Sequence, residues 1–137
     1  MTNIQILRDL TSDILVSMFY LIPETQPEAV KENFEYAANI RAEKLDIIMM
    51  FCKRTAALMA ENFLGTDEIT DQDICDTLKE CINIIAGNFI GKEYPESSLI
   101  VPIPTITKNI KSVNTMNYEK INLYYNEEPT QILVLIE

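Results

Sequence analysis

The chain has 137 residues, a formal net charge of −10 and an apolar fraction of 47%, which suffices for one domain with its own hydrophobic core. Its 21 acidic residues outnumber its 11 basic residues. This balance disfavours nucleic acid and anionic membranes as partners, because both are bound through clustered Lys and Arg. Histidine is absent, which excludes histidine-based acid–base catalysis and the commonest zinc and iron ligand sets.

The cysteines and the apolar runs indicate a compartment. Cys52, Cys75 and Cys81 form no C-x-x-C pair, and an odd number of cysteines cannot close into a disulfide framework. The first residues lack the basic and apolar parts of a signal peptide, and no apolar run approaches the length of a membrane span. We therefore expect a cytoplasmic protein in a reducing environment, with a single domain over residues 1–137 and no membrane partner.

The first predicted element is a helix. Apolar residues recur at helical spacing over residues 4–22. Thr2 and Gln5 form a capping-box pattern at the start of this segment, and Pro23 ends it.

A hairpin and a shorter helix are predicted next. Alternation over residues 34–40 and the nearly unbroken apolar run over residues 45–52 predict two antiparallel strands, the second covered on both faces. Helical spacing over residues 53–64, followed by Gly65 as the terminating residue, predicts the shorter helix.

The last third is predicted to contain strands and irregular links. Residues 99–104 include two prolines and cannot form a central strand, and the polar residues 107–115 are expected to form a loop. Residues 118–125 and 130–136 are predicted to pair as a second hairpin around a four-residue turn. Together these elements predict an α+β fold, with two long helices and one shorter helix packed on a mostly antiparallel sheet.

A long helix, capped by Thr70 and expected to end at Gly91, carries the most informative pattern. At about 100° per residue it has an apolar face and an opposite wet face. Asn83 is a mediocre helix former in the middle of the helix, and Ala86-Gly87 removes side chains from the surface one turn later. The wet face comprises Asp73, Asp76, Glu80, Asn83 and Gly87.

The wet face also has an ordinary explanation. A solvated helix face is normally polar, and acidic residues near a helix N-terminus interact favourably with the helix dipole. Residues 66–80 hold six acids against one base, which is half of the excess negative charge of the chain. Taken alone, this pattern is more typical of a solvent-exposed surface than of a functional site.

The spacing Asp76-x-x-x-Glu80-x-x-Asn83, followed by Ala86-Gly87, resembles the active-site helix of the CheC/CheX/FliY family of chemotaxis phosphatases. The family signature places an Asp or Ser, then Glu four residues later, and then Asn after three more. The order of the predicted elements agrees with this family over nearly the whole chain, so the resemblance implies a CheX/CheC-like fold.

Two further features bear on the resemblance. The family places a proline about twenty residues after the Asn, and both Pro102 and Pro104 lie in that window, so either can correspond to it. CheC-like members carry a second motif on the first long helix, whereas here Asp9-x-x-x-Asp13-x-x-Val16 departs from it. One motif per chain is the CheX-like arrangement, which implies a homodimer.

The resemblance implies hydrolysis of the aspartyl-phosphate of a phosphorylated CheY-like response regulator. Asn83 would orient the attacking water and Glu80 would dock on a lysine of the regulator. Asp76 would make a further polar contact, and Ala86 and Gly87 would let the backbone of the partner come close. The chain would need no cofactor of its own, because the regulator would supply the magnesium ion.

Two alternatives stay open at this point. One is a non-catalytic adaptor of the same fold that binds a receiver domain or a flagellar switch component. The other is an unrelated acidic interaction module whose wet face meets only solvent. A second E-x-x-N sequence, Glu119 to Asn122, is expected to lie on a strand, where residues three apart point to opposite faces. The apolar strand over residues 132–136 is expected to be an exposed edge that could pair across a two-fold axis.

Overall fold

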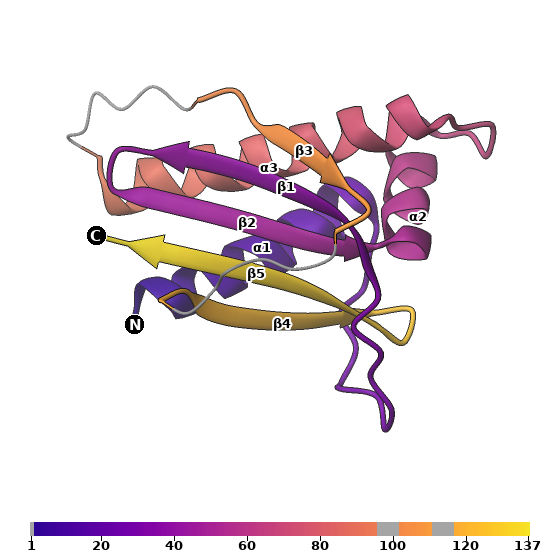
Figure 1. Ribbon diagram of the computed structural model, residues 1–137, viewed down its shortest axis with the longest axis horizontal. Coiled ribbons are helices and arrows are strands. Elements are labelled where there is room, and N and C mark those ends of the chain that lie inside the picture. The colour runs from indigo at the N-terminus through magenta and orange to yellow at the C-terminus, as the bar shows by residue number, and fades with distance from the viewer. Residues whose placement is uncertain (1, 96–101, 111–116) are drawn as a thin grey trace.

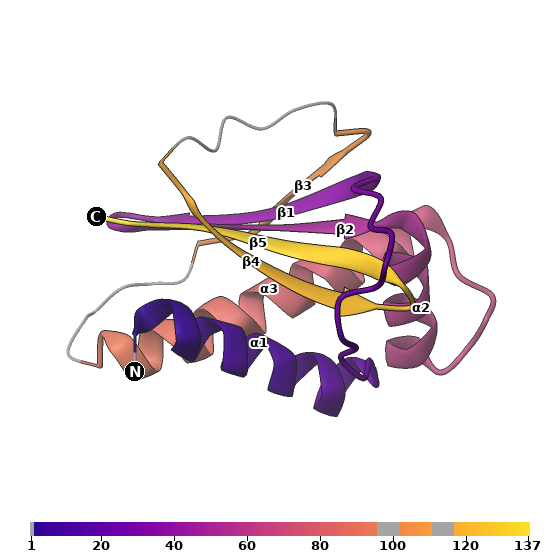
Figure 2. The ribbon, with the colours of Figure 1, turned by 90° about the horizontal axis from the view of Figure 1, so that it is seen from below.

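A computed structural model describes residues 2–95, 102–110 and 117–137. Five strands form one antiparallel sheet, and the helices lie together on one face of it (Figures 1 and 2). The elements in chain order are α1 (Asn3–Phe19), β1 (Phe34–Ala42), β2 (Leu45–Cys52), α2 (Lys53–Leu64), α3 (Asp71–Glu93), β3 (Thr105–Lys108), β4 (Glu119–Tyr125) and β5 (Glu128–Ile136). This arrangement confirms the predicted α+β fold with two long helices and one shorter helix.

The strand order is β3-β1-β2-β5-β4, so the two predicted hairpins join through a β2–β5 pair at the centre of the sheet. The apolar run of β2 is buried on both faces, as predicted. Ile47 and Met49 face the helices and are fully buried. Met50 lies on the other face in a small cluster with Ala37 and Leu133.

The strand β5 is an interior strand, which overturns one prediction. It pairs with β2 along one side and with β4 along the other. The expectation that residues 132–136 form an exposed edge able to pair across a two-fold axis is therefore wrong. Among the described strands, β3 and β4 form the edges of the sheet.

The β4–β5 turn is also tighter than predicted. Asn126 and Glu127 both have positive φ, 53° and 65°, which is the geometry of a two-residue type I′ turn. Pro129 therefore belongs to β5 and not to the turn. It is accommodated because it pairs with Tyr124 of β4, while the pairing of β5 with β2 starts only at Thr130.

Local backbone geometry shifts two further boundaries. The helix α1 starts with the predicted Thr2 capping box, but it ends at Phe19, because Tyr20 adopts the left-handed conformation with φ 55°. Leu21 stays in the core outside the helix, whereas Ile22 is exposed. A bulge in β1 near residue 35 moves Phe34 to the face opposite the helices, which breaks the predicted alternation there.

The strand β3 lies within segments that the sequence patterns assign to irregular structure. It forms an edge of the sheet by pairing with residues 36–39 of β1. Thr107 and Lys108 therefore belong to a strand and not to the predicted loop, of which residues 111–116 lie outside the described part. None of the helices found in residues 2–95, 102–110 and 117–137 is long and apolar enough to cross a membrane.

Candidate functional site

The helix that carries the candidate residues is fixed at its start by a capping box. The hydroxyl oxygen of Thr70 accepts a hydrogen bond from the backbone N–H of Asp73 at 3.1 Å. The carboxylate of Asp73 accepts one from the backbone N–H of Thr70 at 2.8 Å. Two of the unpaired N–H groups at this end are thereby satisfied, and α3 runs from there for 23 residues.

A second set of contacts attaches the first turn of α3 to the sheet. Asp71 accepts a hydrogen bond from the hydroxyl of Tyr36 at 2.7 Å and forms an ion pair with Lys108 at 2.5 Å. These hydrogen bonds, first that of Lys108, lower the pKa of the Asp71 carboxyl. Burial and the same carboxylate raise the pKa of Tyr36. We refer to Tyr36, Asp71 and Lys108 as the β3 clip.

Sequence reasoning missed the β3 clip because residues 105–108 were not expected to form a strand. The sequence contains only weak signals for this strand and its contacts. The alternation of residues 105–108 covers only four positions, and Lys108 is the only base between residues 99 and 110. Neither signal identifies an acidic partner 37 residues away along the chain.

The apolar face of α3 is anchored in the core along its whole length. Leu78, Ile82 and Phe89 are fully buried in the main core cluster. Each such side chain contributes on the order of 2 kcal/mol through removal of its apolar surface from water. This burial fixes the rotation of α3 about its own axis, so the opposite face is presented to solvent in one orientation.

The predicted wet face of α3 is confirmed at its central positions. Asp76, Glu80 and Asn83 are all exposed, and Gly87 is half-buried. Within the described residues, Glu80 and Asn83 form no side-chain hydrogen bond or ion pair, whereas Asp76 accepts a hydrogen bond from Gln72 at 2.8 Å. Glu80 and Asn83 therefore stand ready for an outside partner, and Asp76 is partly engaged within its own helix.

One predicted contact residue lies in the wrong place. Ala86 is fully buried in the core cluster, so it offers no exposed surface to a partner, in contrast to the expectation that Ala86 and Gly87 together let a partner backbone come close. It lies about 100° from Gly87 around the helix, far enough to turn it from the wet face to the core. Gly87 remains on the wet face, and a Cβ placed on it would have nothing within 4 Å.

The end of α3 also differs from the prediction. The helix continues through Gly91 to Glu93, and its capping residue Tyr94 has φ −133°. Gly91 is therefore an interior residue of the last turn, because the chain does not enter the left-handed conformation at this end.

The three cysteines are free and buried, in agreement with a packing role. Burial raises the pKa of Cys52 to about 11 and also raises the pKa values of Cys75 and Cys81. A raised pKa disfavours the thiolate, which is the reactive form. Among residues 2–95, 102–110 and 117–137, no group of three or more His, Cys, Asp or Glu side chains is placed to hold a metal ion.

The second E-x-x-N sequence lies on β4, as predicted. Glu119 is exposed, whereas the side chain of Asn122 accepts a hydrogen bond from Gln131 at 3.0 Å. Residues three apart on a strand point to opposite faces, so these two side chains cannot act on one substrate. On α1, Val16 is 41% exposed at the position where a second motif would carry Asn, and its side chain has no polar group.

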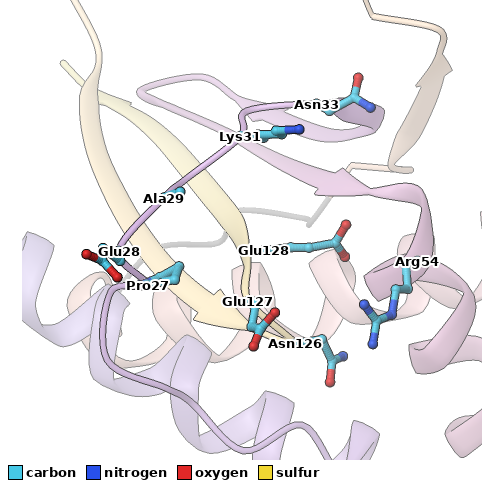
Figure 3. A pocket seen from close by; sticks show the side chains of 9 residues that line it. All are labelled: Pro27, Glu28, Ala29, Lys31, Asn33, Arg54, Asn126, Glu127 and Glu128. Atoms are coloured by element: carbon cyan, nitrogen blue, oxygen red, sulfur yellow. The ribbon is translucent and has the colours of Figure 1, made fainter.

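A surface pocket of about 470 Å³ lies away from α3, between the α1–β1 connection, the start of α2 and the β4–β5 turn (Figure 3). It combines the cations Lys31 and Arg54 with acidic side chains, including Glu127 and Glu128. Glu128 is already engaged by the hydroxyl of Thr55 at 2.9 Å. No residue of α3 lines this pocket, so it is not part of the candidate site.

A comparison with known protein families finds a match that includes the helix carrying Glu80 and Asn83. The family model described as chemotaxis phosphatase CheX matches residues 41–125, a range that includes all of α3. A search of curated proteins found no match.

Solved structures show the same fold. The crystal structure of a chemotaxis protein CheX from Desulfovibrio desulfuricans is 21% identical, with a TM-score of 0.75 over 98% of this chain and 99% of that chain. CheX from Vibrio vulnificus is 12% identical, with a TM-score of 0.74 over 100% and 97%. The CheX–CheY–BeF3–Mg2+ complex from Borrelia burgdorferi is 16% identical, with a TM-score of 0.74 over 99% and 98%.

The family match covers more than half of the chain and contains the helix with the exposed Glu80 and Asn83. On this evidence the chain belongs to the CheX family of chemotaxis phosphatases.

Proposed function

We propose that this protein hydrolyses the aspartyl-phosphate of a CheY-like receiver domain, with Asn83 as the catalytic residue. The observation that carries the proposal is the position of Asn83, which is exposed and uncommitted among the described residues on a helix whose opposite face is fixed in the core. A relative of the same fold has been crystallised with CheY, BeF3 and Mg2+, which supports a receiver as the partner.

The chemistry requires little from this chain. An acyl phosphate is already activated, so the missing contribution is a water molecule positioned in line with the phosphorus atom. A carboxamide suits this task because it both donates and accepts hydrogen bonds and carries no charge that would repel the phosphoryl group. In this proposal the receiver provides the magnesium ion and the groups that hold the phosphoryl oxygens.

Glu80 has a docking role in the proposal. It lies three residues before Asn83 on the same helix face, and both side chains are exposed. A carboxylate aimed at a phosphoryl group would be repelled, whereas a lysine of the receiver would form a charge-assisted hydrogen bond with it. This contact would place Asn83 over the phosphoryl group.

Asp76 and Gly87 lie at the two ends of the helix surface that would contact the receiver. Asp76 lies one turn before Glu80 and adds a polar contact, moderated by its hydrogen bond with Gln72. Gly87 lies one turn after Asn83, where the open space around its Cα lets a partner backbone approach closely.

The test is phosphate release from a purified CheY-type receiver phosphorylated with a small-molecule phosphodonor. Asn83→Ala is expected to lower the stimulated rate by about 10²-fold, because the water is no longer held in the reactive geometry. Asn88→Ala is the matched control. Asn88 is an exposed asparagine on the same helix, but its amide donates to the backbone oxygen of Ile84 at 2.8 Å and lies outside the wet face.

The assay also separates the catalytic proposal from the adaptor alternative. An adaptor would bind the receiver without accelerating phosphate release, and Asn83→Ala would leave the rate unchanged. Glu80→Gln is expected to weaken binding of a receiver loaded with Mg2+ and beryllium fluoride.

We also propose a homodimer, as the family resemblance implies. The interior position of β5 removes the original candidate for strand pairing between copies and leaves the edges at β3 and β4. A monomeric mass by light scattering at assay concentration would refute the dimer without affecting the proposal for Asn83.

A further inference from the structure

Lys79 places a cation one helical turn before the proposed catalytic amide. On a helix, the surface neighbours of a residue lie three and four positions away from it. For Asn83 these neighbours are Lys79, Glu80, Ala86 and Gly87. Glu80 is an anion, Gly87 has no side chain, and the methyl group of Ala86 is buried. Among these four described residues, only Lys79 can bring a positive charge to a group bound at the amide.

The ammonium group of Lys79 is uncommitted within the part of the chain that the structure describes. The ion pair found there joins Lys108 to Asp71 and does not include Lys79. The carboxylate three residues before it, that of Asp76, instead accepts a hydrogen bond from Gln72 at 2.8 Å. Lys79 is half-buried, as is typical of a lysine whose carbon stem packs on the protein while its ammonium stays in water. A charge in this state is available to a partner.

A phosphorylated partner gives this cation a task. A phosphoryl group carries about two negative charges at neutral pH. The exposed carboxylates of Asp76 and Glu80, which lie on the same helix face as Asn83, would repel it. A cation within one turn of Asn83 offsets this repulsion. Because the repulsion exists only when the phosphoryl group is present, the benefit of the cation also depends on the phosphorylated state of the partner.

The reach of the lysine side chain fits this task. Lys79 and Asn83 are four residues apart, which places their Cβ atoms about 5–6 Å from each other on one side of α3. A lysine carries its ammonium on a flexible four-carbon stem, and its three N–H donors can turn toward an oxygen. We propose that Lys79 contacts the phosphoryl oxygens of the receiver and thereby recognises its phosphorylated form. This inference rests on the proposed function of Asn83, which directs a water to the same phosphorus atom.

The test measures binding of a fluorescently labelled CheY-type receiver in two states. One state contains Mg2+ alone, and the other contains Mg2+ and beryllium fluoride, which stands in for the phosphoryl group. The wild type is expected to bind the loaded receiver more tightly. Lys79→Gln keeps a long polar side chain without the charge, so it is expected to weaken binding of the loaded receiver by about tenfold and to leave binding of the unloaded receiver unchanged. Lys79→Arg is expected to retain most of the preference, because it restores a cation.

Two controls make the test specific. Lys92→Gln removes the same charge from an exposed position of the same helix, nine residues after Asn83 and about 13 Å further along the helix axis. It is expected to change the affinity for neither state of the receiver. Thermal unfolding checks the fold, and Lys79→Gln is expected to keep the Tm within about 2 °C of the wild type, because exposed charges contribute little to stability.

Three outcomes would overturn the proposal. One is equal affinity of the wild type and Lys79→Gln for the loaded receiver. Another is equal weakening of both receiver states by Lys79→Gln, which would mean general attraction to an acidic receiver surface. A third is a wild type that binds both states equally. The assay involves no hydrolysis, so it is independent of phosphate release: a lost preference in Lys79→Gln with an unchanged release rate in Asn83→Ala would refute the catalytic role and retain the Lys79 contact.

Discussion

Gly87 allows the proposed contact to be tested by a substitution that strengthens the fold. It lies in the interior of α3, and a Cβ at this position meets nothing within 4 Å. Nothing in the described chain therefore requires glycine here. Replacement by alanine removes a helix-propensity penalty of about 1 kcal/mol. For a domain of this size, a gain of that magnitude corresponds to an increase in Tm of about 4 °C.

The same methyl group is expected to impair the encounter with the receiver. If a partner backbone packs against Gly87, the added carbon overfills a close contact, which costs about 1–3 kcal/mol by analogy with overpacked cores. Gly87→Ala should therefore raise the KM for the phosphorylated receiver while it raises Tm. Opposite effects on stability and activity are hard to obtain from general damage to the fold.

Urea unfolding and the phosphate-release assay measure the two effects on the same protein. Gly91→Ala is the comparison for stability, since Gly91 also has open space around it but lies in the last turn of α3, where a smaller gain is expected. A Gly87→Ala protein that is more stable and equally active would refute the close approach at Gly87. A less stable protein would refute the account of the helix itself.

Two other predictions concern groups with shifted pKa values. The pKa of Asp71 is lowered from 3.8 in the folded protein, chiefly by Lys108, so its contribution to stability is present above pH 3.8 and is lost as the pH falls through the lower folded pKa. Urea titrations of the wild type and Asp71→Asn should therefore give unfolding free energies whose difference shrinks as the pH is lowered below 4. A difference that stays constant with pH would contradict the role of the β3 clip. Burial raises the pKa values of Cys52, Cys75 and Cys81, so Ellman's reagent at pH 8 should label the native protein slowly and the urea-unfolded protein at all three thiols. Rapid labelling of a native thiol would contradict the packing role.

The elements of the fold that could be predicted are those set by local pattern. The capping boxes of α1 and α3, the doubly buried strand β2 and the end of α2 at Gly65 all follow from neighbouring residues. The order of the strands does not follow, because the pairing of β2 with β5 joins segments more than 75 residues apart. Without knowledge of this pairing, the apolar C-terminal strand was predicted to be an exposed edge of the sheet.

In the candidate site, too, the features set by local pattern could be predicted and those set by tertiary contacts could not. Helical periodicity placed Glu80, Asn83 and Gly87 on the wet face correctly, since the spacing of residues around a helix is fixed. Ala86 was not among the residues that periodicity assigned to the wet face; it was expected at the contact because it precedes Gly87 in the motif, and the structure buries it in the core. The β3 clip could not be predicted from the sequence, because it depends on tertiary contacts between β1, α3 and β3.

The central claim is that the amide of Asn83 performs the hydrolytic step, and single-turnover phosphate release measures it most directly. With a receiver phosphorylated in advance and this protein at saturating concentration, binding differences no longer affect the rate. We expect wild type and Asn88→Ala to accelerate release equally, and Asn83→Ala to leave only the intrinsic rate of the receiver. Acceleration by Asn83→Ala equal to that of the wild type would contradict it.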